Sequence, residues 1–589
     1  MSNPVADASP VQKQAVRRVP LEFDQNGDPQ FSSVTSPDSF KVHALGVMPP
    51  KHVIPVIFVP GIMGTNLCAN GAAQKQGTSA WIPPNGAIAG LGEWWRRKGQ
   101  TPVERQEQLS SANTEVYSDG KVGLPRTLFT LTESEAKRRG WGEVHFDSYA
   151  AVLAELELAL NDQKLNPGTG DPRDLPVWTV AKTLKDVKGH DVLKEWGPIK
   201  GDVPPLTDSE FNRLADYYFP VWACGYNWLG SNEDSADLLV QRISDAINWY
   251  KRGKYWISVD QVIVVTHSMG GLVARRAAQK VADQILGVVH GVQPVGGAPV
   301  VYRRFRAGTE TGGIFDLMGS ILAAIIGWDA ADITCVMANS AGPLELLPTK
   351  YYPPGWLKFQ QERDGKNIPV MPYLPVVTPD DKISDPKDGI TDPYRQIYSQ
   401  RVQDVWWGMV DDTLLDPAGV ASKTKSTAMD AYTDTLLKAR TFHDNVKLYF
   451  HPNTYAYYGS DLKQVAFSEV RWVTRNDVPA DATGQLPSLL PETFTKLGQA
   501  TVAVGSQKVT FSLANRDKPK DNDDPSSGDG TVPSPSGELV TGGPNPGPGN
   551  LTVFRMRGFD HQHSYGNLVV QGNVLYCIAK IAQKAPVLS

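Results

Sequence analysis

The chain has 589 residues, of which 41% are hydrophobic and 21% are charged, so it holds ample apolar surface for a folded core. It is too long for one ordinary domain, because single cores stop growing near roughly 250–300 residues. The 58 Lys and Arg residues against 63 Asp and Glu residues give a formal charge of −5. No basic field is therefore present to neutralise phosphates, and nucleic acid is excluded as an expected partner.

Four cysteines, Cys68, Cys224, Cys335 and Cys577, lie far apart without a CxxC pair. This spacing argues against a thiolate metal site and against a disulfide scaffold, and it favours a reducing compartment. The N-terminus lacks the apolar stretch of a secretory signal, and the apolar run 321–328 is shorter than the ~20 residues that span a bilayer. We therefore expect a soluble protein made in the cytoplasm without a signal peptide.

The first half of the chain alternates strand and helix patterns. A β-branched run at 53–59 ends at Pro-Gly, a second at 261–265 leads through THSMGG into a helix-forming segment, and a third covers 285–292. Helical patterns lie between the first two runs, around 148–160 and 235–250. This order predicts an α/β protein with a mostly parallel central sheet covered by helices on both faces.

The second half is less regular. Strand patterns return at 446–450, 454–458 and 551–556, and VAFSEVRWVT and QKVTFSL indicate an antiparallel excursion before a final helix near 567–584. The predicted organisation is a polar arm (1–50), a first core part (51–300) with an insertion at about 101–205, a cap or lid insertion (301–441), and a second core part (442–589).

Ser268 lies on the turn between the second strand and the helix that follows it. Such a turn pushes the hydroxyl out of the sheet, and the helix N-terminus supplies free N–H groups and a favourable dipole. The positions two before and two after the serine must be small, and here they are Thr266 and Gly270, so the usual G-x-S-x-G is present as T-x-S-x-G. We interpret Ser268 as a nucleophile, the alternative being a plain helix cap.

A nucleophilic serine needs donors for the oxyanion. In this architecture one N–H follows the nucleophile and another comes from the loop after an earlier strand. Met269 supplies the first, and Ile62, in the loop VPGIMG, is predicted to supply the second. The alternative is a glycine-containing turn with only a packing role.

The serine also needs a base held by a carboxylate, in the chain order Ser, Asp, His. Asp529 lies in the loop SGDGTVP, and His561 and His563 follow the last core strand in FDHQHSY. A single serine has room for only one of these histidines. Asp461, at a strand end, is the alternative acid if it does not simply cap a turn.

The combination of motifs resembles the branch of the α/β-hydrolases that holds lecithin:cholesterol acyltransferase and the GPI inositol-deacylases. The matching pieces are VIFVPGIMGTNL, CGYNWLGSNEDSADLLVQRI, THSMGGLVAR, NSAGPLELLP, YAYYGSD, GDGTVP and the terminal histidine loop. In that branch the acid stands in GD-x-T-V, which corresponds to Asp529, and the histidine lies about thirty residues on. His561 lies 32 residues after Asp529 and is the preferred base, with His563 as the alternative. Thr266, the long polar N-terminus and 101–205 depart from the pattern.

Within that branch the chain looks like the lipase effectors that bacteria inject through type VI secretion. The resemblance implies an antibacterial phospholipase that acts transiently at the membrane surface in the envelope of a target cell. It also implies an immunity protein and a component of the secretion apparatus as partners.

An apolar helix face around 314–326 carries Leu317, Leu322 and Ile325 where hydrolases of this fold have lids. A buried core helix would look similar. The sequence thus predicts a serine-dependent hydrolase of a phospholipid or other lipid ester, with no cofactor and no metal. Calcium binding by the acidic run 521–524 is an alternative to a solvated loop. An acyltransferase of the same fold and a non-catalytic partner-binding protein are the alternative functions.

Overall fold

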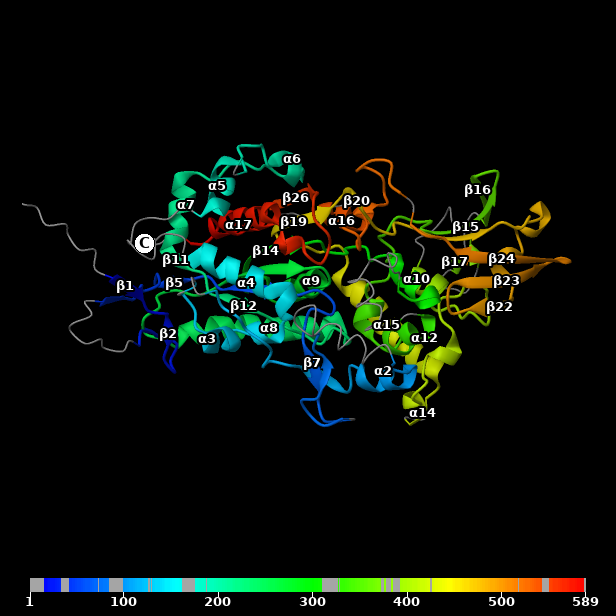
Figure 1. Ribbon diagram of the computed structural model, residues 1–589, viewed down its shortest axis with the longest axis horizontal. Helices are drawn as coiled ribbons and strands as arrows, with labels where there is room; N and C mark the ends of the chain where they lie inside the picture. The colour runs from blue at the N-terminus through cyan, green and yellow to red at the C-terminus, as the bar shows by residue number, and fades with distance from the viewer. Residues whose placement is uncertain are drawn as a thin grey trace, which may run out of the picture.

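The computed structural model describes residues 15–32, 42–72, 74–83, 99–125, 128, 130–161, 175–186, 188–309, 327, 329–371, 376–377, 383–384, 392–423, 426–516, 518–542 and 550–586. The molecule is elongated, with a seven-stranded sheet in one half and a six-stranded sheet toward the other end (Figure 1). Helices fill the space between the two sheets.

The seven-stranded sheet is parallel except at one edge. Its strands, in spatial order, are β10 (Pro198–Lys200), β26 (Asn550–Met556), β19 (Asn453–Gly459), β14 (Ile285–Gly291), β13 (Val262–His267), β6 (Val56–Val59) and β12 (Val221–Ala223). Only β10 pairs antiparallel with its neighbour. The carboxyl ends of the parallel strands therefore meet at one edge, which is where loops can bring chemistry together.

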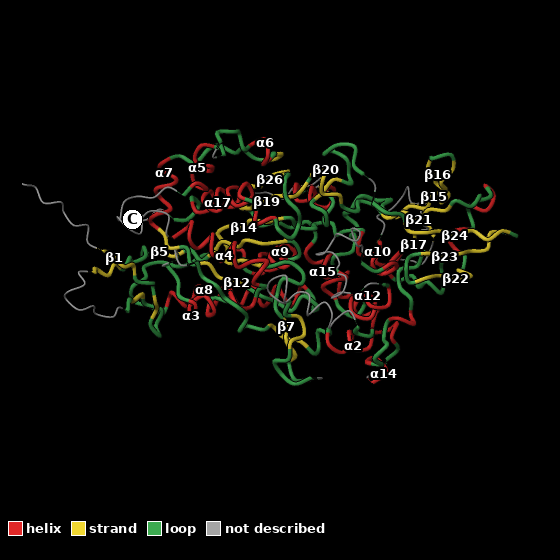
Figure 2. Tube along the Cα trace, in the orientation of Figure 1, coloured by secondary structure: helices red, strands yellow, loops and turns green. Residues whose placement is uncertain are grey.

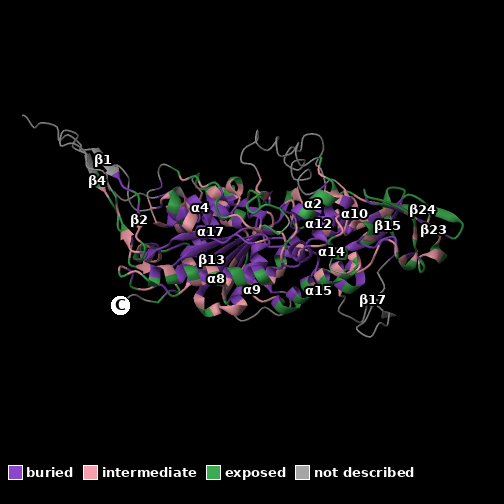
Figure 3. Cartoon of the chain, turned by 90° about the horizontal axis from the view of Figure 1, so that it is seen from below, coloured by how far each residue is buried: buried purple, intermediate pink, exposed green. Residues whose placement is uncertain are grey.

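Both faces of this sheet are buried because alternate residues of each strand point to opposite sides. In β6, Val56 and Phe58 pack into one hydrophobic cluster, whereas Ile57 and Val59 pack into another. The first cluster includes α4 (Phe146–Asn161), α5 (Pro176–Thr183) and α17 (Leu568–Ala582), and the second includes α8 (Asn232–Lys251) and α9 (Gly270–Lys280). Figure 3 shows the buried strands between these two helical layers.

The six-stranded sheet is mostly antiparallel. Its strands, in spatial order, are β16 (Lys366–Met371), β15 (Leu357–Arg363), β21 (Val470–Thr474), β24 (Gln507–Leu513), β23 (Gln499–Val504) and β22 (Pro491–Thr495). Only β15 and β21 run parallel to each other. The sheet forms the strand-rich end of the molecule in Figure 2, and it draws strands from both sides of residue 441.

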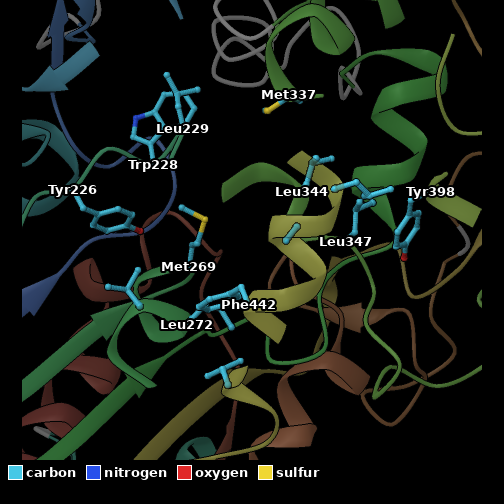
Figure 4. Packing of buried hydrophobic residues seen from close by; sticks show 14 of the residues in the cluster. Tyr226, Trp228, Leu229, Met269, Leu272, Met337, Leu344, Leu347, Tyr398 and Phe442 are labelled. Atoms are coloured by element: carbon cyan, nitrogen blue, oxygen red, sulfur yellow. The ribbon is translucent and has the colours of Figure 1, made fainter. Parts of the chain in front are cut away.

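Buried apolar contacts run from one sheet to the other. The helices between them include α10 (Val300–Ala307), α12 (Ala330–Met337), α13 (Ala341–Leu344) and α15 (Ala428–Val446). One cluster joins Leu272 of α9, Leu344 of α13 and Phe442 of α15, and it continues to Trp472 and Phe511 in the six-stranded sheet. Figure 4 shows the part of this cluster around Met269 and Phe442.

The predicted strands at 53–59, 261–265, 285–292, 454–458 and 551–556 are found as β6, β13, β14, β19 and β26, with end points that differ by a few residues. The predicted helices near 148–160 and 235–250 are α4 and α8, and the antiparallel excursion contains β21 and β24. No helix within the described ranges is both long enough and apolar enough to cross a membrane.

The predicted strand at 446–450 is wrong. Helix α15 continues to Val446, and the chain then turns at Lys447, whose φ angle is 50°. The Arg275 guanidinium donates hydrogen bonds to the carbonyl oxygens of Lys447 and Tyr449. These carbonyl oxygens are therefore bonded to a side chain and not to a neighbouring strand. The alternating apolar residues of this segment pack against the core without forming a strand.

Candidate functional site

Ser268 occupies a strained turn between β13 and α9. Its φ angle is 51°, a left-handed conformation that non-glycine residues adopt rarely, and its residue surface is 5% exposed. A Cβ atom at position 270 would lie 2.4 Å from the carbonyl oxygen of Pro60 and 2.5 Å from that of Val59, so only glycine fits there. Thr266 is buried and its hydroxyl lies 3.0 Å from His290 Nδ1, which gives the unusual threonine of the motif a polar partner.

Ser268, His561 and Asp529 form one hydrogen-bonded series. His561 Nε2 lies 2.9 Å from Ser268 Oγ, and His561 Nδ1 lies 2.8 Å from Asp529 Oδ2. Because an ionised carboxylate only accepts hydrogen bonds, the proton belongs on Nδ1, and Nε2 is then free to accept from the serine hydroxyl. This is the arrangement that a general base requires.

Asp529 is fixed by its own loop. It is 1% exposed, and its Oδ1 accepts hydrogen bonds from the backbone N–H groups of Thr531 (3.0 Å) and Val532 (2.7 Å). A Cβ at position 459 would lie 2.7 Å from Asp529 Cβ, so Gly459 at the end of β19 makes room for the acid. The His561 N–H donates to the Asp529 carbonyl (2.7 Å). The acid and the histidine are thus joined through backbone as well as side chains.

The two alternative residues lie elsewhere. The side chain of His563 is 62% exposed, and its Nδ1 lies 2.9 Å from Asp560 Oδ1. The carboxylate of Asp461 accepts the backbone N–H groups of Lys463 and Gly558, each at 2.9 Å. Asp461 therefore braces the loop that leads from β26 to His561, and no hydrogen bond joins it to a histidine within the described residues.

The two N–H groups expected to bind an oxyanion flank Ser268. Met269 directly follows it, and the loop that carries Ile62 is so close that a Cβ at position 61 would lie 2.9 Å from Ser268 Cβ. Within the described parts of the chain, neither N–H donates to a protein acceptor. Two unpaired donors beside a serine at a helix N-terminus suit developing negative charge.

Two further polar residues beside the site were not singled out from the sequence. His267 directly precedes Ser268, and Tyr149 comes from α4, inside the segment interpreted as an insertion. Tyr149 OH lies 2.9 Å from His267 Nδ1 and accepts a hydrogen bond from the Gly61 N–H (3.1 Å). His267 could have been found from the sequence, because it directly precedes Ser268 in the motif. Nothing in the sequence around Tyr149 indicates that it lies beside the site.

The electrostatic environment of His267 differs from that of an exposed histidine. Burial and, to a smaller extent, the neighbouring His561 ring lower the pKa of His267 to about 3. The ring is therefore neutral at physiological pH, with one nitrogen carrying a proton and the other free to accept.

The remaining predictions fall outside the site. Leu317, Leu322 and Ile325 of the expected lid lie outside the described residues, so the lid stays a prediction. In the acidic run, Asp521 and Asp524 cap backbone N–H groups, and Asp523 pairs with Arg555 at 2.7 Å. No group of three or more His, Cys, Asp or Glu side chains able to hold a metal occurs in the described ranges.

Comparison with solved structures identifies a similar chain in the crystal structure of the Tle4–Tli4 complex. The two chains share 29% sequence identity with a TM-score of 0.70, and the match covers 91% of this chain and 99% of the other. The similarity therefore extends over most of the chain and not over the region of Ser268 alone. No protein-family model and no curated protein matches the sequence.

Proposed function

We propose that the protein is a serine-dependent lipid ester hydrolase with an α/β-hydrolase fold, a phospholipase acting on membrane phospholipids. The observation that carries the proposal is the hydrogen-bonded series from Ser268 through His561 to Asp529, set at a strained strand-to-helix turn. Six parallel strands whose carboxyl ends share one edge, with helices on both faces, support the fold assignment.

In the proposed reaction Ser268 Oγ attacks the acyl carbonyl while His561 Nε2 takes its proton. Asp529 holds the imidazole in the required tautomer and stabilises the imidazolium that forms. The N–H groups of Ile62 and Met269 bind the oxyanion, and His561 then returns its proton to the leaving alcohol. Water, activated by the same histidine, releases the fatty acid and restores the serine.

The biological role that we propose is that of an antibacterial type VI lipase effector. Such a protein is made in the cytoplasm and secreted by a specialised apparatus, and it acts on the membrane of a target cell. The sequence motifs carry this resemblance, and the similarity of 91% of this chain to a chain of the Tle4–Tli4 complex supports it. Because that structure is a complex of two proteins, it also supports a dedicated partner for this chain, which the resemblance implies is an immunity protein.

Product analysis after incubation with phospholipid vesicles tests the proposed function. Free fatty acid from the parent, and none from Ser268→Ala, is the expected result. Transfer of the acyl group to an added alcohol in place of water would identify an acyltransferase, which forms the same acyl-enzyme. Intact lipid with folded parent protein would favour a non-catalytic binding protein and would overturn the proposal.

A further inference from the structure

A buried chain of hydrogen bonds connects the two loops that flank Ser268. It runs from the Gly61 N–H to Tyr149 OH (3.1 Å), from Tyr149 OH to His267 Nδ1 (2.9 Å), and from His267 Nε2 to the carbonyl oxygen of His561 (2.9 Å). Gly61 precedes the expected oxyanion donor Ile62, and His561 is the expected base. The chain thus joins the loop after β6 to the loop after β26.

The direction of each bond follows from its partners. A carbonyl oxygen can only accept, so His267 Nε2 carries the ring proton and donates to His561. The neutral ring then has its lone pair on Nδ1, which accepts the single proton of the Tyr149 hydroxyl. The tyrosine oxygen is left to accept from the Gly61 N–H. One tautomer of His267 satisfies every group in the chain, and the other would leave two acceptors facing each other at the His561 carbonyl.

Packing holds the tyrosine hydroxyl where the chain needs it. The Tyr149 ring centroid lies 5.2 Å from that of Phe58 and 5.6 Å from that of His267. A Cβ at position 64 would lie 2.7 Å from Tyr149 Cε2, so the loop from Gly61 to Gly64 wraps closely around the ring. Burial raises the pKa of the tyrosine, which keeps the hydroxyl protonated as a donor.

His561 is consequently held at four points. Its ring bonds to Ser268 and Asp529, its N–H donates to the Asp529 carbonyl, and its own carbonyl accepts from His267. The last of these bonds connects His561, through His267 and Tyr149, to Gly61 in the loop that carries Ile62.

We propose that Tyr149 and His267 are positioning residues that hold two loops at one fixed separation. These are the loop after β6 that carries Ile62 (the oxyanion loop) and the loop after β26 that carries His561 (the base loop). The inference rests on the proposed function, because the two loops need a fixed distance and orientation relative to each other only if both act on one acyl group. Neither residue touches the substrate. Their effect is to keep the N–H of Ile62 and the imidazole of His561 in line with the Ser268 hydroxyl.

The test compares kinetics on a soluble fatty-acid ester. Tyr149→Phe removes only the hydroxyl, and we expect kcat to fall by about 10- to 100-fold with little change in KM, as for a small misplacement of reacting groups. His267→Leu should do the same, whereas His267→Gln, which retains a donor and an acceptor, should recover most of the lost rate. Tyr565→Phe is the matched control, because it removes a buried hydroxyl bonded to the Thr266 carbonyl in the same aromatic cluster. It should leave kcat near the parent value.

The double variant Tyr149→Phe/His267→Leu gives a readout that general loss of stability would not. If the residues act through one chain, the double variant should lose no more rate than either single variant. Losses that multiply, or a Tyr149→Phe enzyme with parental kcat while Ser268→Ala is inactive, would overturn the inference and leave the proposed function standing.

Histidine ¹⁵N shifts provide a test that does not depend on activity. In the parent, His267 should be neutral and protonated on Nε2, and in Tyr149→Phe the ¹⁵N shift of Nδ1 should change, because that nitrogen loses the hydroxyl that donates to it. A His267 protonated on Nδ1 would overturn the inference even if no ester is turned over, and inactivity of the parent with the expected tautomer would count against the proposed function instead.

Discussion

The two large sheets of the molecule place their strand ends differently. In the seven-stranded sheet, neighbouring parallel strands end at one edge, and the loops there carry Ser268, Asp529 and His561 within hydrogen-bonding distance. In the six-stranded sheet most neighbours are antiparallel, so their ends alternate between two edges. Its buried residues include Trp472 and Phe511, which pack against Trp406. We therefore expect substitutions in the loops of the seven-stranded sheet to change turnover, and substitutions in the six-stranded sheet to change stability.

The largest effect is expected at the nucleophile. Ser268→Ala should lower kcat on a soluble fatty-acid ester by on the order of 10⁶, as for the serine of a cooperating triad. The thermal melting temperature should hardly change, because alanine keeps the Cβ and the backbone conformation and removes only the hydroxyl and its bond to His561. Activity within about tenfold of the parent would remove Ser268 from the mechanism.

Substitution of the two histidines in the same loop should change kcat to very different extents. His561→Ala should be about as damaging as Ser268→Ala, since removing either member of a triad that acts as a unit costs nearly the whole effect. His563→Ala should leave kcat close to the parent value, because its ring is exposed and bonded to Asp560. The reverse result in the same assay would assign the base to His563.

The next largest loss of kcat is expected at Asp529, the proposed acid. Asp529→Asn removes the charge that sets the His561 tautomer, and a loss of about 10⁴ in kcat is expected. Asp461→Asn keeps an oxygen for one of the two backbone N–H groups that the carboxylate accepts, so its loss should be much smaller. Equal losses for the two variants would mean that the bracing of the base loop, and not the charge at Asp529, limits the rate.

In the six-stranded sheet the expected effect is on stability. Trp472 is fully buried, and its Nε1 donates to Tyr302 OH at 3.1 Å. Trp472→Ala should lower the free energy of unfolding by about 3–5 kcal/mol, measured by urea denaturation. The kcat of the protein that remains folded should be unchanged. A large fall in kcat without loss of stability would show that this sheet reaches into the reaction.

A further effect on stability, which depends on pH, concerns the buried carboxyl between the sheets. Burial raises the pKa of Glu345 to about 8, and its oxygens bond to Ser231 Oγ (2.7 Å) and the Asn232 N–H (2.8 Å). With its folded pKa above the unfolded value of 4.5, the stabilising contribution of its protonated form is complete below about pH 4.5 and is lost as pH rises toward about pH 8. Glu345→Gln, which does not titrate, should therefore gain stability relative to the parent by on the order of 1 kcal/mol per pH unit across that window. The same difference in unfolding free energy between parent and Glu345→Gln at pH 4.5 and at pH 8 would contradict the assignment of a neutral carboxyl.

Much of the seven-stranded sheet was predictable from the sequence, because most of its strands are short runs rich in β-branched or aromatic residues that are followed by turns or helices. The strand-turn-helix setting of Ser268 belongs to the same local signal. The short strand β10 and the neighbouring strands β15 and β16 lie in stretches without such a pattern. In addition, β10 pairs with β26 and β15 pairs with β21, and each of these partners is far away in sequence. Tyr149 was missed for the same reason, since its contact with His267 spans 118 residues. The strand predicted at 446–450 is absent, and there the Arg275 guanidinium, from another helix, donates hydrogen bonds to the backbone carbonyl oxygens. This contact also links residues far apart in sequence.

Mass spectrometry after treatment with a fluorophosphonate shows directly whether Ser268 is a nucleophile activated by His561. The reagent phosphonylates a serine only where a neighbouring base and oxyanion donors activate it. We expect one adduct, on Ser268, in the parent, and little or none in a folded His561→Ala protein. An adduct on another residue, or an unmodified Ser268 in folded parent protein, would contradict this expectation.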